Sequence, residues 1–224
     1  PLRLVGSEMC IRDRNNGSSE KSGYESFVYV GYDDSSVYVA GIFNNPKDVP
    51  IEFSQRDDVW EVNAETFFIS INTYDDNINY QSFQITSAGT LGDRYTSGEM
   101  KDEDQNFDTV FESKASIIED GWSMEMRIPY SALRFSSKEI QKWGINFGRK
   151  IVEFGEVYTW NFVDQVNAKY PESMGITNDI KNITPPLRLF FYPYAQSSVD
   201  FKNGDRPTNN YSACLLYTST SPRD

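Results

Sequence analysis

The feature that most constrains this chain is the strict alternation of apolar and polar side chains through residues 122–128, which read Trp-Ser-Met-Glu-Met-Arg-Ile. Such alternation is typical of a β-strand with one face in a core and the other in water. Pro129 follows at once and predicts the end of the strand, because proline has no N–H to give to a sheet. The segment therefore predicts a half-buried strand that carries Trp122 on its core face.

Further strand signals recur on both sides of this segment. Short turns rich in Asp, Asn, Ser or Gly separate runs of β-favouring residues, which is typical of hairpins. The predicted pairs are 27–32 with 37–43, 66–71 with 80–85, 110–118 with 122–128, and 143–151 with 157–162. The arms of the first hairpin are apolar at nearly every position, which predicts a central place in a sheet.

The remaining segments complete an all-β prediction. Residues 187–192 and 195–201 are predicted strands, and residues 99–108 and 164–186 are predicted loops. Helical periodicity is almost absent, and aromatic residues, which favour the pleated surface of a sheet, make up 15% of the chain. The sequence therefore predicts an antiparallel two-sheet β-sandwich of the jelly-roll or immunoglobulin-like class, with a single barrel as the alternative.

Charge and the lack of histidine narrow the classes of function. The chain has 21 basic and 33 acidic residues, a net charge of −12. Proteins that bind nucleic acid or anionic lipid need a basic face, so neither is an expected partner. The chain contains no histidine, which excludes histidine-based triads, histidine metal sites and imidazole general bases within it.

Carboxylates on or beside the predicted strands are the candidates for catalysis. A glycoside hydrolase needs two of them, roughly 5–10 Å apart across a cleft. The candidates that could face one another are Glu112, Glu125, Glu153 and Glu156. Their spacing demands no catalytic pair, and the wet faces of amphipathic strands explain them more simply. The sequence therefore predicts a domain that is itself non-catalytic.

Acidic turns are the candidates for binding a cation. Residues 57–58, 75–77 and 102–104 each cluster carboxylates, the hard oxygen ligands that Ca²⁺ prefers. None matches a calcium-loop pattern, and solvated turns are the alternative. Asp75, Asp76 and Asn77 are the strongest candidate, because such a cluster at a hairpin tip can form the turn and also bind a cation. Structural Ca²⁺ is the candidate cofactor.

Tryptophans in loops or at strand ends give the candidate ligand site. The apolar C–H face of a sugar ring covers an indole well, and its hydroxyls take hydrogen bonds from Arg, Asn, Gln and Glu side chains. Trp60 lies in a polar loop, and Trp160 lies near the end of a predicted strand. Core packing is the alternative for both. Arg56 and Asn161, close to them in the sequence, are the predicted hydrogen-bonding partners of a saccharide.

The two ends of the chain differ from the rest. Residues 1–14 and 214–224 follow no periodic pattern and resemble peptides encoded by sequencing-adapter DNA at the ends of assembled environmental reads. Ordinary unstructured termini are the alternative. Cys10 and Cys214 lie in these flanks, so the adapter interpretation predicts a native stretch without a disulfide, cut at both ends.

Two segments resemble a known family. Residues 120–135, DGWSMEMRIPYSALRF, and 143–149, WGINFGR, are similar to the family 9 carbohydrate-binding-module-like domain that opens a group of large bacterial envelope proteins. Shorter matches extend the resemblance over roughly residues 25–195. The resemblance implies a β-sandwich over residues 15–186, glycan binding and often structural calcium. It also implies that residues 187–213 begin an outer-membrane-type region like a β-barrel.

Together the residues and the resemblance predict a glycan-binding domain whose partner is a polysaccharide or oligosaccharide. The resemblance implies a secreted, periplasmic or outer-membrane protein of a Gram-negative bacterium, linked to polysaccharide catabolism and to hydrolysis of O-glycosyl compounds. Two alternatives stay open. One is a structural or gating module of an outer-membrane barrel without sugar binding, and the other is a glycoside hydrolase.

Overall fold

The structure is a computed structural model that describes most of the chain. The described residues are 2–5, 9–11, 14–15, 23–45, 48–97, 102–104, 107–164, 169–186, 189–200 and 208–219. The chain divides into two compact units, residues 1–185 and 186–224. Within the described residues, no helix is long and apolar enough to cross a membrane.

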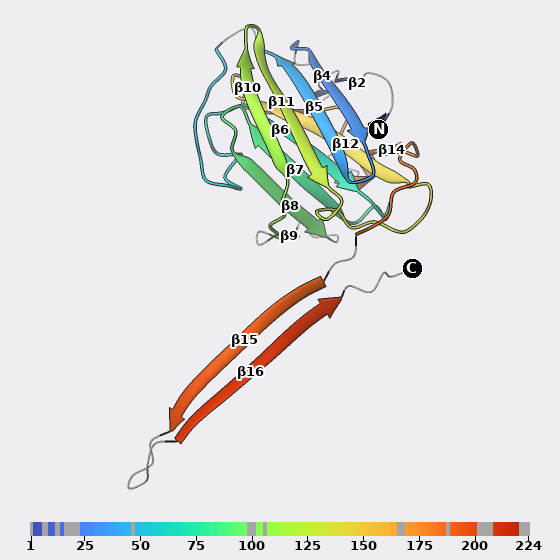
Figure 1. The fold of residues 1–224 in the computed structure, drawn as a ribbon. Coiled ribbons are helices and arrows are strands. Elements are labelled where there is room, and N and C mark those ends of the chain that lie inside the picture. The colour runs from blue at the N-terminus through green and yellow to red at the C-terminus, as the bar shows by residue number, and fades with distance from the viewer. Residues whose placement is uncertain are drawn as a thin grey trace. The chain divides into compact units, whose positions relative to one another are not determined.

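The first unit contains two antiparallel sheets that pack face to face (Figure 1). Sheet 1 has the strand order β1-β4-β5-β11-β10, with β2 also paired to β4. Its strands are β1 (Arg3–Leu4), β2 (Met9–Ile11), β4 (Ser26–Tyr32), β5 (Ser36–Asn44), β10 (Glu112–Ile118) and β11 (Gly121–Pro129). The predicted central place of the first hairpin is confirmed, because β5 lies between β4 and β11.

Sheet 2 has the order β3-β13-β12-β6-β7-β8-β9, with β14 also paired to β12. Its strands are β3 (Arg14–Asn15), β6 (Thr66–Asn72), β7 (Tyr80–Thr86), β8 (Leu91–Ser97), β9 (Asp102–Asp104), β12 (Trp143–Ile151), β13 (Glu156–Thr159) and β14 (Gly175–Thr177). A single 3₁₀ turn spans Tyr170–Ser173. Neither sheet closes on itself, so the predicted sandwich is confirmed and the barrel alternative is wrong for this unit.

All four predicted hairpins are present, as β4–β5, β6–β7, β10–β11 and β12–β13. The predictions for two loops are wrong in part. Strand β9 lies within 99–108, and the 3₁₀ turn and β14 lie within 164–186. Strand β8 was not predicted either. Strands β9 and β14 have only three residues each, and β8 carries Gly92, Asp93 and Arg94 in its first half, so no alternation marks these strands. Pairing with β7, β8 and β12 makes them strands.

The core lies between the two sheets and is rich in aromatic rings. Trp122 on β11 and Trp143 on β12 are both fully buried, as the alternation predicts for Trp122. Phe43 of sheet 1 packs against both sheets. Its ring centroid lies 4.5 Å from that of Trp122 in sheet 1 and 5.3 Å from that of Phe67 in sheet 2. Burying such side chains stabilises the fold by about 3 kcal/mol each.

The turn between β4 and β5 is organised by one carboxylate, that of Asp33. Its Oδ1 accepts hydrogen bonds from the backbone N–H of Ser35 at 2.7 Å and of Ser36 at 2.9 Å, and its Oδ2 accepts one from Tyr38 Oη at 2.9 Å. The bond from the Ser35 N–H is the largest cause that lowers the pKa of Asp33 from 3.8 to about 2, against the opposing effect of burial.

We expect Asp33→Asn to lower stability by about 1 kcal/mol near neutral pH, because the amide cannot accept at both ends. A carboxylate with a depressed pKa stabilises the fold above its unfolded value of 3.8, and this contribution is lost as the pH falls toward 2. Thermal unfolding should therefore show a gap of roughly 2–4 °C between wild type and variant near neutral pH. If the two melting temperatures differed as much near pH 2 as they do near neutral pH, the result would contradict this role of the Asp33 carboxylate.

The second unit contains one antiparallel hairpin, formed by β15 (Leu189–Asp200) and β16 (Thr208–Ser219). The two strands predicted over 187–192 and 195–201 are one continuous strand instead, and Pro193 is accommodated within it. A hairpin of two strands is marginally stable in water by itself. The barrel-like interpretation of residues 187–213 stays a prediction.

The predicted flanks also contain short strands. β1 and β2 pair with β4, so residues 3–4 and 9–11 take part in sheet 1. Cys214 lies on β16 as an exposed free thiol, and the side chain of Cys10 lies outside the described residues. The adapter origin of residues 1–14 and 214–224 stays a prediction.

Candidate functional site

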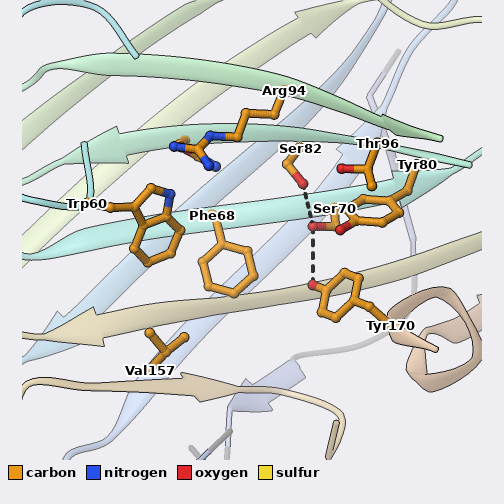
Figure 2. Close-up of a pocket in the computed structure, with 10 residues that line it drawn as sticks. Trp60, Phe68, Ser70, Tyr80, Ser82, Arg94, Thr96, Val157 and Tyr170 are labelled. Carbon is orange, nitrogen blue, oxygen red and sulfur yellow. Dashed lines mark hydrogen bonds between the residues drawn. The ribbon is translucent and has the colours of Figure 1, made fainter. Parts of the chain in front are cut away.

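A pocket of about 340 Å³ lies on the face of sheet 2 that is turned away from the core. Alternation along the strands explains its position. Phe67 and Ile69 of β6 point into the core, so Phe68 and Ser70 point to the opposite face. Small-molecule sites usually have volumes of about 300–1,000 Å³. The lining residues, shown in Figure 2, are Trp60, Phe68, Ser70, Tyr80, Ser82, Gln84, Arg94, Thr96, Val157 and Tyr170.

Hydroxyl groups form a connected row in the middle of the pocket (Figure 2). Ser70 and Ser82 are directly paired across β6 and β7, and their Oγ atoms lie 2.7 Å apart. Tyr170 Oη donates to Ser70 Oγ at 3.2 Å. Burial raises the pKa of Tyr170 well above its ordinary value, so the phenol stays protonated and keeps its donor. The row can both donate hydrogen bonds to a polar ligand and accept them.

An aromatic pair lies at each end of this row. The rings of Trp60 and Phe68 have centroids 5.6 Å apart, and those of Tyr80 and Tyr170 are 5.0 Å apart. The strand register explains why the first aromatic pair is separated from the serines. Phe68 is paired with Gln84, and this position lies two residues along each strand from the Ser70–Ser82 pair. Figure 2 shows the two pairs at opposite ends of the pocket. Trp60 is only half-buried, so part of its indole face is available to a ligand.

Lys150 fixes the loop that carries Trp60. It lies on β12, and its Nζ donates to the carbonyl oxygens of Trp60 at 2.6 Å and Val62 at 3.0 Å. Two hydrogen bonds from one ammonium group hold the backbone of an otherwise irregular segment against sheet 2. The position of the indole is therefore set by the sheet as well as by its own loop.

Gln84 lines the pocket, but its side-chain oxygen is itself buried. The residue is 3% exposed, and its Oε1 receives no hydrogen bond within the described part of the chain. A buried acceptor left unsatisfied costs about 1–3 kcal/mol. Gly92 pairs with Gln84, and its lack of a side chain makes space for this oxygen. A Cβ at Gly92 would come within 3.1 Å of Oε1.

The structure separates the two tryptophans that the sequence proposes for ligand binding. Trp60 lines the pocket, whereas Trp160 stacks on Phe147 with ring centroids 5.0 Å apart and an angle of 7° between the planes. Phe147 belongs to the core, and Trp160 packs against that core. Val157 lines the pocket, so alternation along β13 and its continuation turns Trp160 to the other face.

Asn161 follows Trp160 and is not among the residues that line the pocket. Its backbone N–H donates to Asn146 Oδ1 at 3.1 Å, and its carbonyl accepts from Asn146 Nδ2 at 3.3 Å. Both bonds use the backbone of Asn161. They attach the segment after β13 to β12. A ligand role for Trp160 and Asn161 stays a prediction.

Arg56 lies at a different place and holds a loop to the edge of sheet 2. It forms an ion pair with Asp93, whose side chain is 0% exposed, and another with Asp108 at 3.2 Å. It also donates to the carbonyl of Thr109 at 2.9 Å. Burial raises the pKa of Asp93, against the opposing effects of the hydrogen bonds from Thr109 and of the Arg56 charge. These contacts give Arg56 a structural role outside the pocket, and a ligand role for it stays a prediction.

We expect Arg56→Gln to lower the free energy of unfolding by about 2 kcal/mol, because the buried Asp93 carboxylate loses its cation. Urea unfolding measures the loss. Arg127→Gln is the matched control, since Arg127 pairs with the exposed Glu112 at 3.4 Å and its replacement should leave stability nearly unchanged, as is usual for exposed ion pairs. Equal stability of the two variants would refute the structural role of Arg56.

The predicted calcium residues lie in the turn between β6 and β7. Asp75 forms an ion pair with Lys142, and Asp76 Oδ1 accepts from the backbone N–H groups of Ile78 and Asn79, both at 2.9 Å. The carboxylates are thus engaged by the protein. Among the described residues, no three Asp, Glu, His or Cys side chains gather as metal ligands. In this arrangement Asp75, Asp76 and Asn77 do not fit a calcium site, and calcium binding stays a prediction.

The candidate carboxylates for hydrolysis are dispersed. Glu112 and Glu125 lie on β10 and β11 of sheet 1, whereas Glu153 and Glu156 lie at the β12–β13 turn of sheet 2. None of the four lines the pocket. The four candidate glutamates therefore form two groups on different sheets, and neither group lies at the pocket.

Comparisons with known proteins bear on the fold. No family model matches the chain, and no curated protein matches it. A protein from Bacteroides uniformis ATCC 8492 described as carbohydrate-binding is similar in structure, with a TM-score of 0.57 and 14% identity over 82% of this chain and 85% of that one.

Two structures of a family 9 carbohydrate-binding module from Caldicellulosiruptor kristjanssonii, in complex with cellotriose and with glucose, are also similar, each at 13% identity. They cover 82% and 78% of this chain and 81% and 83% of their own, with TM-scores of 0.49 and 0.48. The likeness to the Bacteroides protein shows that this chain shares its fold.

Proposed function

We propose that the sandwich is a saccharide-binding module that holds its ligand in the pocket of sheet 2. The observation that carries this proposal is the partly exposed Trp60 beside a row of hydroxyls in one pocket. The shared fold with the Bacteroides protein, which is described as carbohydrate-binding, supports it. The sequence resemblance to family 9 modules supports it independently.

The pocket has the two kinds of surface that a sugar ring needs. The apolar C–H face of a pyranose can stack on Trp60, which stands against Phe68 and is anchored through Lys150. The hydroxyls at the ring edge can then exchange hydrogen bonds with the Ser82 hydroxyl. Aromatic stacking supplies affinity, and the polar groups fix the orientation of the ring.

Binding without cleavage is part of the same proposal. None of the described residues that line the pocket is Asp or Glu, whereas hydrolysis by the usual mechanism uses a pair of carboxylates at the bond that breaks. A hydrolase would have to bring carboxylates from elsewhere to the ligand. The partner is an oligosaccharide or polysaccharide. An envelope location and a link to polysaccharide catabolism are further proposals that rest on the resemblance.

Isothermal titration calorimetry against a broad panel of oligosaccharides tests the proposal. We expect at least one glycan to bind, with a reducing-sugar assay detecting no release from it. Heats that stay flat across the whole panel would contradict the proposal and favour a structural module. Sugar release that is lost on replacing one of the four candidate glutamates would favour a hydrolase instead.

A further inference from the structure

The pocket has a second aromatic pair, which a single sugar ring on Trp60 leaves unused. The rings of Tyr80 and Tyr170 lie 5.0 Å apart with 47° between their planes, and both residues line the pocket and are partly exposed. They come from separate elements, since Tyr80 begins β7 and Tyr170 begins the 3₁₀ turn. A tyrosine offers a flat apolar ring with a polar tip, so this pair is a second surface on which a sugar ring can stack.

The strand register sets the distance between the two aromatic pairs. Phe68, which contacts Trp60, is paired with Gln84. Tyr80 lies four residues from Gln84 along β7, so their Cα atoms are roughly 13 Å apart at the usual rise of an antiparallel strand. A pyranose ring is much shorter than this distance, and each unit advances an extended sugar chain by less than half of it. A ring that stacks on one pair therefore cannot stack on the other.

Hydroxyl groups occupy the interval between the two aromatic pairs (Figure 2). Ser82 lies midway between Gln84 and Tyr80 on β7, and it is paired with Ser70 of β6. Thr96 is paired with Tyr80 and adds a third hydroxyl to the lining. Each of these hydroxyls can donate a hydrogen bond and accept one, as the hydroxyls of a sugar do. Along the pocket the order is therefore aromatic, hydroxyl, aromatic, which suits successive units of one sugar chain.

We infer that the pocket selects a linear trisaccharide or a longer chain, with one unit stacked on Trp60 and a later unit stacked on Tyr80 and Tyr170. The unit between them exchanges hydrogen bonds with the serine hydroxyls. A monosaccharide reaches only one aromatic pair and is a poor ligand. This inference rests on the proposed function and adds to it the second stacking surface and the length of chain that the pocket recognises.

Titration calorimetry with chain-length series tests the inference. The probes are linear gluco-, manno-, xylo- and galacto-oligosaccharides, each series running from the monosaccharide to the hexasaccharide. In a series that binds, we expect the trisaccharide to bind about tenfold or more tightly than the monosaccharide. The physical reason is that the longer chain stacks on a second aromatic surface and also reaches the hydroxyls between the two.

Three variants locate the gain with chain length. Tyr80→Ala should weaken trisaccharide binding about tenfold and leave monosaccharide binding unchanged, because only the second stacking surface is lost. Tyr170→Phe keeps the ring and should keep most of the gain. Tyr29→Ala is the matched control, since Tyr29 is a partly exposed tyrosine of β4 in sheet 1. Circular dichroism checks the fold, and if Tyr80→Ala does not fold, the chain-length series on the wild-type protein still decides.

The outcomes separate the two proposals. Equal affinity for the monosaccharide and the trisaccharide in every series that binds, or a gain with length that survives in Tyr80→Ala, would overturn the inference and leave saccharide binding standing. No binding of any probe from any series or from the broad panel would overturn both. A gain with length that is lost in Tyr80→Ala and kept in Tyr29→Ala would support both.

Discussion

Replacing Trp60 with alanine is expected to weaken saccharide binding by about 2 kcal/mol, or roughly thirtyfold. The indole supplies the flat apolar surface on which a sugar ring stacks, and its removal also leaves the buried Phe68 facing an open pocket. Affinity gel electrophoresis with a polysaccharide, followed by calorimetry with the best oligosaccharide of the panel, measures the loss.

Trp160→Phe is the matched control for this prediction. Trp160 stacks on Phe147 and packs against the core, so phenylalanine should keep the aromatic contact and leave affinity within about twofold of wild type. The sequence treats both tryptophans as candidate ligand residues, and the structure distinguishes them. Loss of binding in Trp160→Phe with normal binding in Trp60→Ala would place the site elsewhere.

Replacing Gly121 with alanine is expected to cost about 4 kcal/mol or to prevent folding. Gly121 begins β11 with a φ of 147°, a backbone conformation that side chains disfavour. A Cβ there would collide with the carbonyl oxygen of Phe43 and come within 2.9 Å of the backbone nitrogen of Asn45. Both contacts are with backbone, so relief would separate β11 from β5 at the point where Gly121 pairs with Asn44.

Gly155→Ala is the control for the backbone strain alone. Gly155 has a φ of 64°, but a Cβ there would meet nothing within 4 Å. This substitution should cost only about 1 kcal/mol, the usual penalty for a side chain in the left-handed region. Urea unfolding of the two variants separates strain from collision. If Gly121→Ala were no less stable than Gly155→Ala, the close approach of β11 to β5 would be wrong.

Local pattern was enough to predict much of the fold. Alternation in β11 and the turn residues between adjacent strands mark the four hairpins, because neighbouring strands that pair directly leave both signals in one stretch of sequence. The pairings of β11 with β5 and of β12 with β6 join distant segments, and nothing local specifies them. β8 was missed because Gly92, Asp93 and Arg94 break its apolar pattern.

The candidate site was harder to predict than the fold. Trp60 could be proposed from its polar surroundings alone. Ser70, Ser82 and Gln84 occupy the positions of β6 and β7 that alternate with the core residues. Alternation could therefore have placed all three on one face of the sheet, but it could not have shown that this face carries a pocket. Tyr170 reaches the pocket from a 3₁₀ turn about a hundred residues away from Ser70, and its contribution depends on tertiary structure.

The central claim is that the ligand binds on the outer face of sheet 2, at Trp60. Backbone and indole NMR chemical shifts, recorded during titration with the tightest oligosaccharide, test it most directly. The account predicts that the largest changes occur at the Trp60 indole N–H and at the amides of Ser70, Ser82 and Arg94, with the amides of β10 and β11 unchanged. Changes confined to sheet 1, or to the Trp160 indole, would contradict it.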